Sequence, residues 1–122
     1  MNILIVDDSS ANLHMLRSLL ELEGDTVFTA ENAQAALETL AQQPIQMAII
    51  DWMMPGMSGV ELVRHIRRTY MERYIYLILL TALGEHDQIA EGLESGADDY
   101  IVRGVKPREL LARIRIGKRM VS

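Results

Sequence analysis

The chain contains no cysteine among its 122 residues. Disulfide bonds and cysteine-based metal sites are therefore excluded, and the composition fits a reducing compartment, so we expect a cytoplasmic protein. The longest apolar run covers residues 74–80, far short of the roughly 18 residues that cross a bilayer. The first residues carry no basic leader, so we expect neither a signal peptide nor a membrane anchor.

Acidic residues outnumber basic ones by 17 to 12, so the formal net charge is −5. We therefore expect no direct contact with nucleic acid from this domain. The sequence has neither a P-loop nor a Gly-x-Gly-x-x-Gly motif, which excludes the nucleotide sites built on those loops. No repeat or linker interrupts the chain, so residues 1–122 are predicted to form one domain with its own core.

One stretch of the sequence organises the rest. Five of the six residues from Ile45 to Ile50 are apolar, and they are followed by Asp51 and a turn at Pro55-Gly56. This pattern predicts a strand that is buried on both faces and ends in a carboxylate. On this stretch alone, an aspartate that merely begins a turn explains the pattern equally well.

Apolar, strand-like segments recur along the chain, at residues 3–6, 26–29, 45–51, 74–80 and 100–102. Helical patterns alternate with them, beginning after Ser9, Asn32 and Ser58, at about residue 85 and at about residue 107. Five strands alternating with five helices predict an α/β fold, with a doubly wound parallel sheet covered on both faces.

The helices differ in how firmly they should be held. The fourth helix, residues 85–95, has a thin apolar stripe of Ile89, Ala90 and Leu93, which predicts a weakly held element. In the third helix we expect the arginines to point outward, and in the last helix we expect the basic residues between 113 and 119 to form a solvated face. The apolar residues of the last helix should face the core: Leu110, Leu111, Ile114 and Ile116.

Polar residues follow three of the predicted strands: Asp7-Asp8, Asp51 and Thr81. The carboxyl ends of parallel strands share one edge of the sheet, so these groups should meet there. Two carboxylates about 4 Å apart repel by roughly 4 kcal/mol at an effective dielectric of 20, and bound Mg²⁺ would relieve that repulsion. Asp51 could then act as a nucleophile that forms an acyl phosphate. The alternative is that these acids only cap loops.

Several motifs now stand in order along nearly the whole chain: residues 4–8, 51–59, 80–82, 96–102 and 109–113. Together they make the chain resemble the receiver domain of two-component response regulators. The resemblance implies a flavodoxin-like fold with strand order 2-1-3-4-5. It also implies a phosphorylation-dependent switch in a phosphorelay. Such a domain is not an enzyme in its own right, although it assists its own phosphorylation and dephosphorylation.

The resemblance assigns a role to each site residue. Asp51 would accept a phosphoryl group from a sensor histidine kinase. Mg²⁺ would be held by Asp8, Asp51 and the backbone carbonyl of Met53, with Asp7 assisting through water. Thr81 would bind the phosphoryl group, and Tyr100 would follow it inward as the aromatic switch residue.

The same resemblance implies a signalling surface made by the fourth helix, fifth strand and fifth helix. This surface would meet an output domain, a downstream protein or a second copy of the domain. The last helix, from about residue 107, could lead to an output domain outside this sequence.

The sequence departs from the family where Lys-Pro normally follows the fifth strand, because Arg103 and Gly104 stand there. Arg103 keeps the positive charge, so we expect it to bind the phosphoryl group in place of the family's lysine. Its larger planar fork should nevertheless fit poorly in the same gap beside Asp51. The bond before Gly104 should be trans, since a non-proline cis bond costs about 3 kcal/mol. Lys106 is a candidate substitute, although Pro107 fits better as the start of the last helix.

Two other functions remain open at this point. One is a receiver-like binding module that does not signal through phosphate, which the change to Arg103-Gly104 supports. The other is a metal-dependent phosphatase with Asp51 as nucleophile, which is disfavoured because Met53 occupies the place of a second acid.

Overall fold

The computed structural model describes residues 1–82 and 86–121, and the side chains of all of these except 86–88. Its five strands are β1 (Asn2–Val6), β2 (Thr26–Ala30), β3 (Met47–Asp51), β4 (Tyr76–Thr81) and β5 (Asp99–Val102). Its helices are α1 (Ser10–Leu22), α2 (Ala33–Gln42), α3 (Gly59–Thr69), α4 (His86–Glu94) and α5 (Pro107–Val121). All neighbouring strands pair in parallel in the order β2-β1-β3-β4-β5, which confirms the predicted flavodoxin-like fold.

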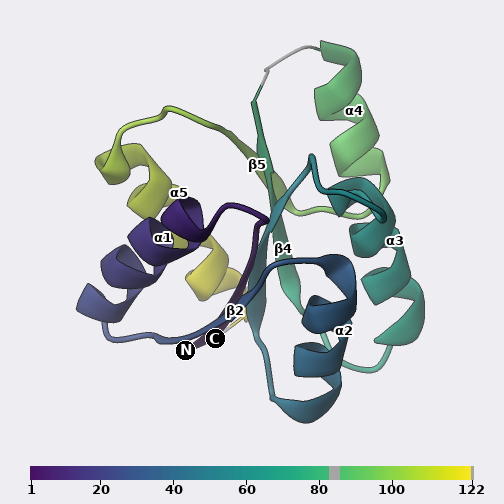
Figure 1. Cartoon of the computed structure of the whole chain (residues 1–122), viewed down its shortest axis with the longest axis horizontal. Helices are drawn as coiled ribbons and strands as arrows, with labels where there is room; N and C mark the ends of the chain where they lie inside the picture. The colour runs from purple at the N-terminus through teal and green to yellow at the C-terminus, as the bar shows by residue number, and fades with distance from the viewer. Residues whose placement is uncertain (83–85, 122) are drawn as a thin grey trace.

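The sheet forms the middle layer of three. Helices α1 and α5 cover one face, and α2, α3 and α4 cover the other (Figure 1). Every residue of β3 and β4 is buried, because these central strands have helices on both sides. All strands therefore end at one edge, the upper one in Figure 1.

Three helices begin at the predicted caps. The side chains of Ser9, Asn32 and Ser58 each accept a hydrogen bond from the backbone N–H three residues further on, at 3.3, 2.8 and 3.3 Å. Such caps satisfy an N–H group that the helix itself leaves unpaired. Pro107 is the first residue of α5, as predicted. The predicted start of the fourth helix at residue 85 lies outside the described residues.

Only part of the apolar stripe of α4 faces the core. Ile89 is partly buried, but Ala90 is exposed and Leu93 is 43% exposed, whereas Gly92 is buried. A Cβ atom on Gly92 would lie 3.1 Å from both Leu79 Cδ1 and Trp52 Cζ3. Helix α4 therefore approaches the sheet closely through a glycine rather than through larger side chains.

A similar correction applies to α5. Leu110 and Ile114 are buried and Leu111 is partly buried, as expected, but Ile116 is 47% exposed. Gly117 faces the sheet instead, and a Cβ atom there would lie 2.6 Å from Tyr76 Cε1. Because Gly117 faces the sheet, the adjacent Ile116 lies on a different side of the helix and points outward.

The basic residues of α5 are not all solvated. Arg115 pairs with Glu23 at 2.7 Å, and Lys118 pairs with Asp25 at 2.6 Å. The Asp25 side chain is only 4% exposed. These pairs join the end of α5 to the turn between α1 and β2, at the edge of the sheet opposite the strand ends that carry the acids.

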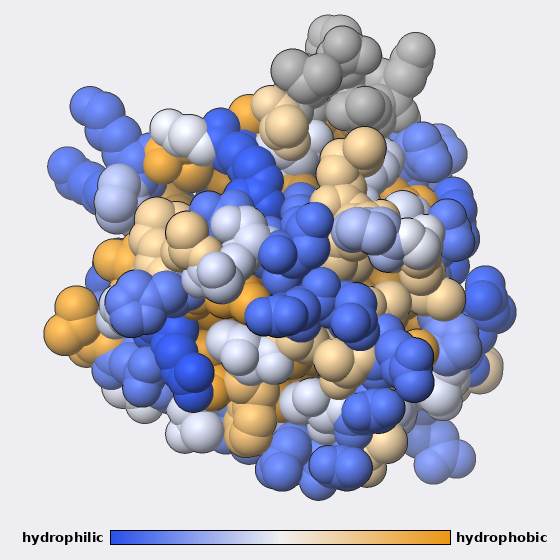
Figure 2. All heavy atoms as spheres, in the orientation of Figure 1, coloured by the Kyte–Doolittle hydropathy of each residue, from blue (hydrophilic) through white to orange (hydrophobic). Residues whose placement is uncertain are grey.

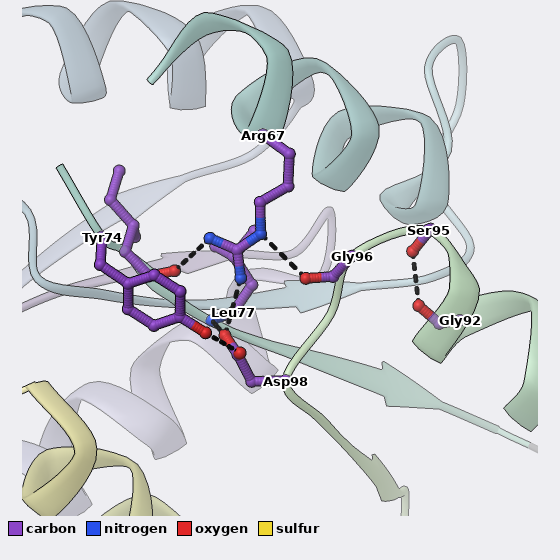
Figure 3. A network of polar contacts seen from close by, with 8 residues as sticks. Arg67, Tyr74, Leu77, Gly92, Ser95, Gly96 and Asp98 are labelled. Atoms are coloured by element: carbon purple, nitrogen blue, oxygen red, sulfur yellow. Dashed lines mark hydrogen bonds and ion pairs between the residues drawn. The ribbon is translucent and has the colours of Figure 1, made fainter. Parts of the chain in front are cut away.

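Arg67 of α3 also differs from its predicted outward position (Figure 3). Its guanidinium donates to the carbonyls of Gly96 and Ile75 at 2.9 and 2.6 Å, and to Asp98 Oδ2 at 2.7 Å. The guanidinium carbon lies 4.9 Å from the centre of the Tyr74 ring, and the Tyr74 hydroxyl donates to Asp98. Arg67 thus fixes the loop between α4 and β5 to α3 and the start of β4.

The surface is mostly polar on the face shown in Figure 2, where smaller apolar areas lie between hydrophilic side chains. Among the described residues, no helix combines the length and apolar character needed to cross a membrane.

Candidate functional site

The three predicted acids meet at the carboxyl edge of the sheet. Asp7 and Asp8 follow β1, and Asp51 is the last residue of β3. One oxygen from each carboxylate lies within 4.8 Å of the others. Asp7 is fully buried and Asp51 is 6% exposed, whereas Asp8 is exposed. The structure therefore brings together the cluster that the sequence predicted.

Arg103 enters this cluster from the loop after β5. Its Nη2 atom lies 2.6 Å from Asp7 Oδ2 and 2.9 Å from Asp51 Oδ1. The expectation that an arginine would fit poorly beside Asp51 is thus wrong. The described residues contain no cis peptide bond, so the bond before Gly104 is trans as predicted, and Gly104 has a φ of +93°. Proline cannot adopt that value, because its ring holds φ near −65°.

The pKa of Asp51 is raised above its ordinary value of 3.8. Burial is the largest cause, because it disfavours the charged carboxylate, and the hydrogen bond and charge of Arg103 act in the opposite direction. Burial by itself would lower the pKa of Arg103, but the bonds to Asp7 and Asp51 outweigh it and raise that pKa. Arg103 is therefore a permanent positive charge inside the acid cluster.

The other predicted site residues take up different positions. Thr81 ends β4 beside the strand of Asp51 and is 3% exposed. Tyr100 lies in β5, is partly buried and packs against the core on the α2–α3 side. The Met53 side chain is 71% exposed, while its N–H donates to Asp51 Oδ1 at 3.4 Å. Lys106 is exposed at the start of α5, so Arg103 is the basic residue that reaches the acids.

Sequence reasoning missed three groups that support the acids. The Ser9 N–H donates to Asp7 Oδ1 at 2.9 Å, and the Asn12 amide donates to Asp7 Oδ2 at 3.4 Å. A Cβ atom on Gly59 would lie 2.3 Å from the carbonyl oxygen of Asp51. The glycine directly after the Ser58 cap was the available signal, because a glycine at a helix start can mark a close backbone approach.

The donor set fits a magnesium ion. Oxygen atoms bound directly to one Mg²⁺ lie at most about 4.2 Å apart, since each Mg–O distance is about 2.1 Å. The three carboxylate oxygens lie within 4.8 Å of one another. A small side-chain movement would bring them within about 4.2 Å, and the exposed Asp8 side chain can make that movement. Carboxylate oxygens are also the ligands that Mg²⁺ prefers. The cluster can therefore hold this ion.

Comparison with known proteins agrees with this geometry. The profile of the response regulator receiver domain matches residues 3–115. The chain belongs to this family. A receiver domain is a phosphoacceptor switch of two-component signalling, and it receives its phosphoryl group from a sensor histidine kinase. The prediction of a receiver domain is confirmed, and the binding-only alternative is not favoured.

Individual relatives support the assignment. The chain is 43% identical over 113 residues to the phosphate regulon transcriptional regulatory protein PhoB of Pseudomonas aeruginosa, covering 93% of this chain and 49% of that protein. The receiver domain of the Francisella response regulator 1452 superposes with a TM-score of 0.91 at 27% sequence identity, covering 99% of this chain and 98% of that chain. The chemotaxis protein CheY4 of Vibrio cholerae superposes with a TM-score of 0.88 at 28% sequence identity, covering 94% of this chain and 96% of that chain. The chain thus spans about half the length of the curated relatives it matches.

Proposed function

We propose that Asp51 is the phosphoacceptor of this receiver domain. The observation that carries the proposal is its position: a buried carboxylate at the end of β3, with Asp7 and Asp8 beside it and Arg103 Nη2 2.9 Å away. A carboxylate oxygen of Asp51 attacks the phosphorus of the phosphohistidine. The N–P bond breaks, an acyl phosphate forms, and the histidine leaves with the electron pair of that bond.

The charges around Asp51 suit this transfer. The raised pKa of Asp51 makes its carboxylate more basic than an ordinary aspartate, while the Arg103 guanidinium favours its charged form. The same guanidinium can bind an oxygen of the incoming phosphoryl group, since arginine forms charge-assisted hydrogen bonds to phosphate. By these means the domain would assist its own phosphorylation.

We assign the metal site to Asp8, Asp51 and the backbone carbonyl of Met53, with Asp7 assisting through water. Bound Mg²⁺ would offset the repulsion between the phosphoryl oxygens and the carboxylates. The exposed Asp8 side chain can adjust to the ion, while the buried Asp7 and Asp51 are held by neighbouring groups.

The switch would run from Asp51 toward α4. Thr81 lies at the end of the neighbouring strand and would bind the phosphoryl group, and Tyr100 would follow it inward. The contact of Gly92 with Trp52 supports this direction, because Trp52 follows Asp51 directly and packs against α4. Phosphorylation can therefore change how α4 rests on the sheet.

The surface of α4, β5 and α5 is the proposed output surface. It carries the Arg113–Asp99 and Arg113–Glu109 ion pairs at 3.3 and 3.7 Å, together with the 43% exposed Leu93. Ion pairs that solvent reaches in part, such as these, contribute little to stability and can exchange for pairs with a partner. The partner would be an output domain reached through α5, a downstream protein or a second copy of the domain. We place this signalling in the cytoplasm, as the cysteine-free sequence leads us to expect.

The test is the intact mass of the protein after incubation with Mg²⁺ and a small acyl-phosphate donor. The wild type should gain one phosphoryl group. Asp51→Asn should gain none, while the control variant Asp99→Asn should behave as the wild type. Equal labelling of wild type and Asp51→Asn would overturn the assignment.

A further inference from the structure

One nitrogen atom of Arg103 lies between two carboxylates from different strands. Its Nη2 atom donates to Asp7 Oδ2 at 2.6 Å and contacts Asp51 Oδ1 at 2.9 Å. The side chains of Asp7 and Asp51 are 1% and 8% exposed, and that of Arg103 is 29% exposed. A monovalent cation of the protein itself therefore occupies space among the acids where a divalent ion would be attracted.

Asp7 is committed to this cation. Its Oδ2 atom receives the shorter of the two contacts with Arg103 and a hydrogen bond from the Asn12 amide, and its Oδ1 atom accepts the Ser9 N–H. Both oxygens of Asp7 are thus engaged by the protein. In contrast, the exposed Asp8 has a carboxylate that solvent and ions can reach.

We infer that Arg103, anchored by Asp7, is a built-in competitor of Mg²⁺ that sets the metal affinity of the site. This inference rests on the proposed metal site at Asp8 and Asp51. The guanidinium and the ion are both positive and are attracted to the same carboxylates, so each weakens the binding of the other. Arginine does not lose its proton in proteins, so the competition ends only when the guanidinium moves.

The structure offers a place for that movement. A cavity of about 290 Å³ borders Arg103 between α1 and the loop after β5, and its lining includes Asn12, Met15 and Gly104. Met15 is 50% exposed, so this side of the cavity reaches solvent. Leaving aside its two chain neighbours, no described residue has an atom within 4 Å of the position a Gly104 Cβ atom would take. The cavity therefore offers the guanidinium a space into which it can move away from Asp51.

Calorimetric titration with Mg²⁺ alone tests the inference, using four proteins: wild type, Arg103→Gln, Asp7→Asn and the double variant. Arg103→Gln should bind Mg²⁺ about tenfold more tightly than the wild type. When Asp7→Asn is also present, Arg103→Gln should tighten Mg²⁺ binding by only about threefold, because Arg103 is then no longer anchored. Circular dichroism checks the fold of each variant.

Arg115→Gln is the matched control, since Arg115 is also ion-paired but lies at the opposite edge of the sheet. It should leave the dissociation constant of Mg²⁺ unchanged. If Arg103→Gln does not fold, Arg103→Lys replaces it. The shorter lysine keeps the charge but loses the fork, and it should bind Mg²⁺ several-fold more tightly than the wild type.

The outcomes separate the inference from the proposed function. Equal or weaker Mg²⁺ binding in a folded Arg103 variant overturns the competition. If Arg103→Gln changes the dissociation constant of Mg²⁺ by the same factor with Asp7 present and with Asp7→Asn, the anchoring role of Asp7 is overturned. Absence of Mg²⁺ binding from all four proteins overturns the proposed metal site itself.

Discussion

The bridge between Arg103 and the two buried acids should contribute measurably to stability in the absence of metal. Removing one partner of a buried ion pair costs about 3–5 kcal/mol. The Arg103 side chain is 29% exposed, so solvent screens part of this, and we expect Arg103→Gln to lose about 2 kcal/mol at pH 7. With a urea m-value of about 2 kcal/mol/M, the midpoint of unfolding should fall by about 1 M.

The loss should depend on pH. The folded-state pKa of Asp51 lies above 3.8, so the fold favours the protonated form of Asp51. This contribution to stability is complete below the unfolded-state pKa and disappears as the pH rises through the folded-state pKa. Removing Arg103 raises that pKa further, because Arg103 opposes the effect of burial. The difference between wild type and variant should therefore be below about 1 kcal/mol near pH 4 and grow toward pH 7.

Urea unfolding in EDTA at several pH values measures this difference. Arg115→Gln serves as the control; the Arg115 side chain is 56% exposed, so its loss should cost less than about 1 kcal/mol at every pH. An equal loss for Arg103→Gln at pH 4 and pH 7 would show that packing, not charge, is responsible. No loss at either pH would refute the stabilising bridge.

Three further changes have defined outcomes. Gly59→Ala should destabilise the fold by about 3 kcal/mol or more in urea unfolding, because its Cβ atom would lie 2.3 Å from the carbonyl oxygen of Asp51; a midpoint equal to that of the wild type would contradict this. Asp8→Asn should stabilise the metal-free protein by less than about 1 kcal/mol and should abolish the rise in Tm that Mg²⁺ causes in the wild type; equal or lower metal-free stability would refute the repulsion. Asp98→Ala should cost about 3 kcal/mol in urea, because it leaves Arg67 without its carboxylate, and a loss below 1 kcal/mol would count against that network.

The sequence was sufficient for the strands and for the acids at their ends. The apolar runs before Asp7 and Asp51 are buried strands, and parallel pairing brings these acids to one edge. Local signals were equally reliable, since Ser9 and Ser58 cap helices as predicted. Such features depend on a few consecutive residues or on a simple periodicity.

The errors arose where distant segments decide the position of a side chain. Gly92 and Gly117 bring helices close to the sheet, but a glycine adds nothing to a hydrophobic pattern. The pattern therefore does not show that the neighbouring Leu93 and Ile116 lie exposed. The helical pattern predicts that Arg67 points into solvent, since a local pattern carries no information about partners up to 31 residues away.

The position of Arg103 likewise depends on a segment whose path the sequence does not reveal. Its reach depends on the path of the loop through Gly104, whose φ of +93° cannot be read from residue identity alone. Side-chain size alone predicts a poor fit of arginine beside Asp51, whereas the Nη2 atom of Arg103 contacts both Asp7 and Asp51.

Locating the modified residue distinguishes Asp51 from the neighbouring acids as the carrier of the phosphoryl group. The protein would be phosphorylated with an acyl-phosphate donor and Mg²⁺, reduced with borohydride to trap the acyl phosphate, and digested for peptide mass spectrometry. We predict that Asp51 alone is converted to the reduction product. Reduction at Asp7 or Asp8 instead, or a phosphorylated protein with no reduced aspartate, would contradict the assignment of Asp51 as phosphoacceptor.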